Sequence, residues 1–106
     1  MFLPVKEYDL FVPLNYNDGT PVEPEKLNRL KRLLVEEFGG LTHFPQENEG
    51  LWKIGNVTFR DKIVILRLVA SNSVRADDFL AALKPKLQED WRQADFLIVS
   101  RAVTVL

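Results

Sequence analysis

LWKIGNVTFRDKIVILRLVA, residues 51–70, holds two β-rich segments separated by a Gly-Asn pair. A Gly-Asn pair between two such segments is a recognised two-residue connection of a β-hairpin. In that register Ile54 faces Val57 and Trp52 faces Phe59, so four apolar side chains share one side. The stretch therefore predicts a tight hairpin that runs into a long strand.

The long strand, KIVILRLVA at residues 62–70, is apolar on both faces. Alternate residues of a strand point to opposite faces of the sheet, and here both alternating sets are aliphatic apart from Lys62 and Arg67. The end of the chain repeats this pattern, because residues 96–105 predict another strand with apolar residues on both sides. We therefore expect two strands that are covered on both faces.

The remaining elements lie on either side of a leucine-rich helix. KEYDLFV, residues 6–12, alternates with period two and predicts a strand. Residues 24–38 carry an apolar face at steps of three and four and are followed by two glycines, as expected for an amphipathic helix and its end. LTHFPQ, residues 41–46, reads as a short strand. A second helix is expected over residues 74–91, kinked at Pro85.

This order predicts an α+β fold, a ferredoxin-like βαββαβ plait formed by residues 1–106 as a single domain. Two helices would cover one face of an antiparallel sheet, with an extra hairpin near residues 51–60. The other sheet face would be apolar, and exposed apolar patches of this kind usually mark an interface. We therefore expect a homodimer through the sheet face, with these interface candidates: Ile63, Ile65, Val69, Leu97, Val99 and Val103.

Four short runs carry a family resemblance. FGGLT at residues 38–42, GLW at 50–52 and an Asp-led strand at 61–68 follow NDGTPV at 17–22. This layout resembles small bacterial domains of uncharacterised function that share an F-x-G-x-T … G-x-W pattern. The resemblance implies a ferredoxin-like element order and a bacterial-type cytosolic protein. It implies no activity and assigns no functional residue.

Composition excludes several classes of function. The net charge is −1, from 14 basic and 15 acidic residues, so no nucleic-acid partner is expected from bulk electrostatics. There are no cysteines, which excludes disulfides and thiolate metal sites. No apolar stretch approaches the ~20 residues of a membrane span, and the chain starts without a basic n-region, so we expect a cytoplasmic protein with no membrane partner. No cofactor and no metal are expected.

His43 is the first candidate for chemistry, because histidine is the side chain that titrates near neutral pH. On an extended strand it would share a side with Glu47 and Glu49, without the spacing of a metal motif. Asp61 follows the hairpin, and nothing in the spacing joins it to His43. A surface or edge-strand histidine is the simpler interpretation.

Two arginines form the second candidate. In the usual strand order of the plait, Arg67 and Arg101 lie on strands that flank the strand carrying Glu7 and Asp9. If the parities agree, the four side chains meet on the face without helices. They would then form either a structural ion-pair network or an anion-binding site. Trp52 could stack on a planar ligand, although an aromatic stripe at strand spacing is more often core or interface.

The leading functional hypothesis is a homodimeric interaction or ligand-binding module without catalytic activity. The alternative is a cofactor-independent enzyme of the dimeric α/β-barrel type, acting on a small aromatic or anionic substrate. In that enzyme His43 would be the base, Arg67 or Arg101 would bind the anion and Trp52 would stack, all around one pocket. Nucleic-acid binding through the open sheet is a third alternative, which the charge balance disfavours.

Overall fold

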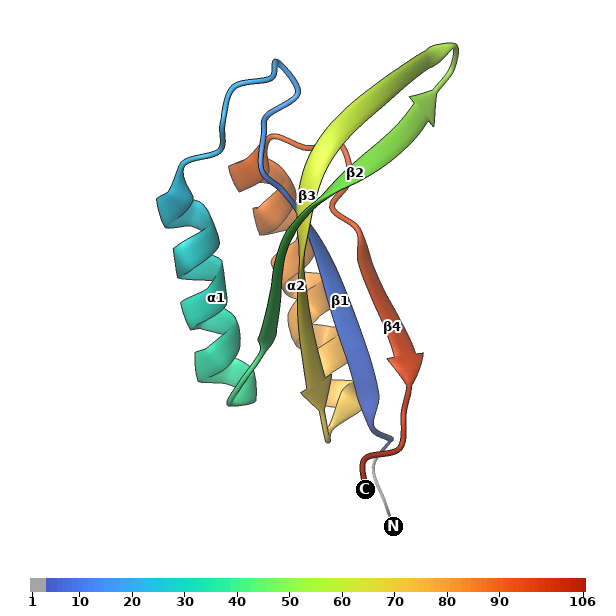
Figure 1. Cartoon of the computed structure of the whole chain (residues 1–106). Coiled ribbons are helices and arrows are strands. Elements are labelled where there is room, and N and C mark those ends of the chain that lie inside the picture. Colours follow the sequence, from blue (N-terminus) through green and yellow to red (C-terminus); the bar gives the residue numbers. More distant parts are fainter. Residues whose placement is uncertain (1–3) are drawn as a thin grey trace.

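The computed structural model describes residues 4–106 as a two-layer α+β fold, with a four-stranded antiparallel sheet on one side and two helices on the other (Figure 1). This confirms the predicted class and is compatible with a ferredoxin-like plait. The elements in chain order are β1 (Lys6–Pro13), α1 (Pro24–Phe38), β2 (Thr42–Ile54), β3 (Val57–Ala70), α2 (Ser73–Trp91) and β4 (Ile98–Ala102).

The strand order across the sheet is β2-β3-β1-β4. β1 is a central strand, paired antiparallel with β3 along its whole length and with β4 along its first half. Alternation then sorts the side chains into two sets. One set faces the helices, and the other forms the surface that we call the open face.

The core lies between the sheet and the helices. β1 contributes Tyr8, Leu10 and Val12, which alternate as the sequence predicts. The leucines of both helices close over them, and Trp91 and Phe96 fill the end of the layer, edge to face with ring centroids 5.7 Å apart. This burial is the main stabilising contribution, because apolar area removed from water is worth about 25 cal/mol per Å².

The two helices begin and end for identifiable reasons. Pro24 lies in the first turn of α1, where its missing N–H costs nothing. The cap of α2 is Asn72, whose side chain accepts a hydrogen bond from the Arg75 N–H. α2 runs through Pro85 as one continuous helix. Neither helix is long and apolar enough to cross a membrane.

The predicted hairpin near residues 51–60 is not an extra element, which corrects the expected layout. β2 continues from residue 42 to residue 54 and pairs with β3 up to the turn, in the predicted register of Ile54 opposite Val57. The polar segment between the two expected strands does not end β2, because it is absorbed by a bulge between Phe44 and Asn48 that contains Pro45. Residues 50–60 are thus the far end of β2 and β3, which extends beyond the neighbouring strand β1 (Figure 1). We call this end the arm.

β4 is shorter than the predicted 96–105, because only Ile98–Ala102 pair in the ladder with β1, opposite Lys6–Leu10. The chain on either side still hydrogen-bonds to the neighbouring backbone. The Phe11 N–H donates to the Leu97 carbonyl (3.0 Å), and the Val103 N–H donates to the Val5 carbonyl (3.2 Å). Leu97 and Val103 therefore lie in line with β4 but outside its bounds.

Gly39 ends α1 in the left-handed conformation, with φ = 82°, and its N–H donates to the Val35 carbonyl at 2.7 Å. Replacing Gly39 with alanine should lower the free energy of unfolding by about 1 kcal/mol, since a side chain is strained at this φ even though the space is open. Chemical denaturation measures the change. Gly40→Ala is the matched control, because Gly40 has no positive φ, and an equal loss in both variants would contradict the argument.

Candidate functional site

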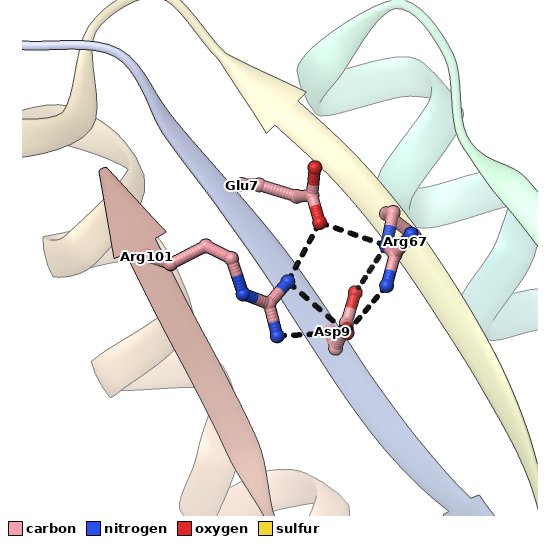
Figure 2. A network of polar contacts seen from close by, with 4 residues as sticks. All are labelled: Glu7, Asp9, Arg67 and Arg101. Atoms are coloured by element: carbon pink, nitrogen blue, oxygen red, sulfur yellow. Dashed lines mark hydrogen bonds and ion pairs between the residues drawn. The ribbon is translucent and has the colours of Figure 1, made fainter. Parts of the chain in front are cut away.

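Four charged side chains meet on the open face, at the centre of the sheet (Figure 2). Asp9 lies opposite Arg67 on β3, and Glu7 lies opposite Arg101 on β4, so the strand register alone brings the four residues together. The sequence parity anticipated this meeting. We call the group the arginine–carboxylate cluster.

Asp9 is bonded by both arginines of the cluster. Its side chain is only 4% exposed, and both carboxylate oxygens are bonded by Arg67, with Nε to Oδ1 at 2.8 Å and Nη2 to Oδ2 at 3.0 Å. Arg101 adds two longer contacts to Oδ2, at 3.2 and 3.3 Å. Glu7 completes the ring, because its Oε1 lies 2.6 Å from Arg101 Nη1 and 2.9 Å from Arg67 Nε.

The electrostatics follow from this geometry. The hydrogen bond from Arg67, reinforced by Arg101, holds the pKa of Asp9 below its ordinary value, against the opposing effect of burial. The same bond to Asp9 raises the pKa of Arg67. Two guanidinium groups and two carboxylates leave the cluster neutral, and the guanidinium of Arg67 also stacks on the Phe44 ring at 5.0 Å. The arrangement therefore has the form of an ion-pair network that links β3, β1 and β4. Anion binding by Arg67 and Arg101 stays a prediction.

His43 lies on the other face of the sheet. It pairs with Leu66 in the ladder, and Leu66 is a core residue on the helix-covered side. Its Nε2 atom is buried and has no hydrogen-bond partner within residues 4–106. Burial, with a smaller contribution from the charge of Lys31, lowers the pKa of His43, so the neutral imidazole is favoured. It is an edge-strand histidine, as the simpler interpretation predicts, but half-buried.

Trp52 lines a hollow of about 290 Å³ on the open face, between the arm and the segment that joins α2 to β4. The indole folds back along β2 over Gly50. A β-carbon at Gly50 would lie 3.4 Å from Trp52 Nε1 and 3.9 Å from Ile63 Cγ2. Phe59, directly opposite Trp52 in the ladder, lines the same hollow. We call this hollow the arm pocket.

The structure does not bring the suggested catalytic residues into one site. Trp52 lines the arm pocket, whereas His43, Arg67 and Arg101 do not. His43 is separated from Trp52 by the thickness of the sheet, since the two side chains belong to opposite faces. Across residues 4–106, no group of three or more histidine, aspartate or glutamate side chains is placed to hold a metal ion.

The six interface candidates share the open face by register. Ile65, Val69, Val99 and Val103 lie around the arginine–carboxylate cluster, and Ile63 and Leu97 lie in the wall of the arm pocket. Their role in an interface stays a prediction.

Sequence reasoning missed two contributors to the open face. Phe44 was expected within a short separate strand, but its register opposite Ile65 places it beside Arg67. The segment Gln93–Leu97 closes one side of the arm pocket, and nothing periodic in it announces that role. The position of Phe44 on the open face could have been predicted by pairing β2 with β3, because the partner of Ile65 lies on the same face as Ile65. The position of the 93–97 segment required the whole fold.

No protein-family model and no curated protein matches the chain. Two solved structures are similar to it in fold. One is a phage SAM lyase in complex with S-methyl-5'-thioadenosine, at TM-score 0.69 and 15% identity over 94% of this chain and 82% of that chain. The other is the divalent ion tolerance protein CutA1 from Ehrlichia chaffeensis, at TM-score 0.63 and 12% identity over 100% of this chain and 86% of that chain. At these identities the likeness concerns the fold alone, and it supports a small α+β architecture for this chain.

Proposed function

We propose that this chain is a homodimeric interaction module without catalysis of its own, in which a second copy covers the open face and the arm. One observation carries the proposal: the arm exposes large apolar side chains that a monomer would leave in water. Ile54 is 63% exposed and Val57 is 55% exposed, beside the partly exposed rings of Trp52 and Phe59. All four share one side of the arm.

The arm also lacks internal support. It is a two-stranded ribbon, and such ribbons are marginally stable in water unless a third strand or another layer packs on them. Along the same side of β3 this apolar cluster is followed by Asp61 and then, on the open face, by Ile63 and Ile65. Exposed apolar side chains gathered on one side, as at the end of the arm, usually mark an interface, and an identical chain supplies a matching apolar surface without any other partner.

The enzyme alternative has less support. Its base, His43, and its stacking residue, Trp52, lie on opposite sheet faces. The fold likeness to a SAM lyase does not assign lyase chemistry to this chain. The cytoplasmic location stays the expectation from the sequence.

Ile54→Asp should weaken self-association at least tenfold, because a charge would be buried without a partner within the apolar side, next to the turn at the tip of the arm. Size-exclusion chromatography with light scattering, at several micromolar concentrations, measures the effect. Leu51→Asp is the matched control, since Leu51 is equally exposed at 61% but faces the other side of the arm, opposite Arg60. A wild-type chain that is monomeric throughout this range would overturn the proposal, and so would equal weakening by both variants.

A further inference from the structure

The arm pocket combines features that point to a ligand. Its floor and walls are apolar and aromatic, formed by Phe11, Trp52, Phe59, Ile63 and Leu97. Its volume of about 290 Å³ lies at the lower end of the range for small-molecule sites. A mostly apolar hollow with a few convergent polar groups is the usual form of such a site.

One carboxylate in the pocket stands apart from the others of the open face. Asp61 lies on β3 between Phe59 and Ile63 in the alternation, so its side chain is on the same side as theirs. It is half-buried, and no hydrogen bond or ion pair reaches its side chain from residues 4–106. Glu7 and Asp9, by contrast, are both paired with arginine.

The ladder explains why this carboxylate has room. The residue opposite Asp61 is Gly50, which has no side chain, and the Trp52 indole leans over the space that is left. A negative charge thus lines the same pocket as two aromatic rings. This is the combination that attracts organic cations, through the ring quadrupole and the carboxylate together.

The other charged groups at the pocket do not cancel this charge. Lys53 also lines the pocket, but its side chain starts from the opposite side of the arm to that of Trp52. Asp95 is bonded to Lys84 at 2.9 Å. Asn17 and Gln93 at the rim add polar groups without charge. On the Trp52 side of the arm, within residues 4–106, the carboxylate without a paired cation is therefore that of Asp61.

We propose that the arm pocket binds a small organic cation with apolar substituents, such as a quaternary ammonium group, which rests against Trp52 and Phe59 and is neutralised by Asp61. The site is formed by one chain and goes beyond the proposed self-association. A second copy on the open face would narrow its mouth.

The test uses a matched pair of probes, choline and its neutral isostere 3,3-dimethylbutan-1-ol. In nitrogen-15 spectra the chain gives two indole signals, and Trp52→Phe identifies the one from Trp52. Titration with choline should shift the Trp52 signal and leave the signal of Trp91, which is buried, unchanged. Choline should bind about tenfold tighter than the neutral probe, since cation–π and charge contributions are absent from the latter.

Asp61→Asn should lower that tenfold preference to about threefold, the part that contact with the aromatic rings supplies, while the neutral probe binds as before. Glu49→Gln, which removes one negative charge from the helix side of the same strand pair, should leave the preference intact. Equal affinity of both probes for the wild-type chain, or no shift of the Trp52 signal, would overturn the proposal. Light scattering on the same samples separates the two proposals. A choline response in a monomeric chain would refute self-association alone, and a dimer without the response would refute the cation site alone.

Discussion

Replacing Asp9 with asparagine should lower the free energy of unfolding by about 2 to 4 kcal/mol. The Asp9 carboxylate is almost fully buried and bonds two guanidinium groups, so its loss leaves Arg67 and Arg101 with only Glu7 as an anionic partner. Asparagine has nearly the same shape as aspartate, so the substitution removes the charge and leaves the packing almost unchanged. Urea unfolding at pH 7 and a fixed protein concentration measures the change, because association alters apparent stability.

Glu7→Gln is the control for this experiment, because Glu7 is more exposed and makes only one contact with each arginine. It should cost less than Asp9→Asn. A loss under 1 kcal/mol in Asp9→Asn would contradict this prediction and show that the cluster adds little to stability.

The same cluster predicts a pH dependence. The folded-state pKa of Asp9 is below the ordinary value of about 3.9, so its stabilising contribution is complete above that pH and is lost as the pH falls through the folded-state pKa. The difference in stability between the wild type and Asp9→Asn should therefore shrink as the pH falls below about 4. A difference that stays constant from pH 6 to pH 2.5 would show that Asp9 contributes packing and not charge.

Trp91→Ala should lower the free energy of unfolding by about 4 kcal/mol. The indole is almost completely buried, packs edge to face on Phe96, and donates a hydrogen bond from Nε1 to the Pro13 carbonyl at 3.1 Å. Its removal would leave a cavity and an unpaired buried carbonyl, and both penalties add. Thermal and urea unfolding both measure the loss.

Two further tryptophan variants serve as controls for this prediction. Trp91→Phe keeps most of the volume but removes the Nε1 donor, so it should cost about 1 to 2 kcal/mol. Trp52→Ala, at the partly exposed tryptophan of the arm, should cost less than 1 kcal/mol under conditions where the chain is monomeric. Similar losses for Trp52→Ala and Trp91→Ala would contradict the assignment of Trp91 to the core.

His43 shows where sequence reasoning stops short. Alternation along β2 shows which residues share a side with His43, but it does not show which side the helices cover. His43 could therefore be named as a candidate but not assigned to a face of the sheet. The ladder places it opposite Leu66, beneath the helix layer, and the unpartnered Nε2 atom follows from that burial. The predicted edge strand was correct, but the environment of the imidazole was not available from spacing.

The sequence alone determined the α+β class, the start and end of α1, the turn at the tip of the arm and the parity of Glu7, Asp9, Arg67 and Arg101. These features depend on local geometry: the 3.6-residue period of a helix, the two-residue period of a strand and the positive φ that glycine allows. Each of them can be read from a short segment of the sequence. The tertiary structure decided that β2 and β3 are continuous, that His43 and Trp52 lie on opposite faces, and that Asp61 stands beside two aromatic rings in the arm pocket. Those features depend on which strands become neighbours and on how far each extends past the next, and such long-range pairing leaves no periodic trace in the sequence.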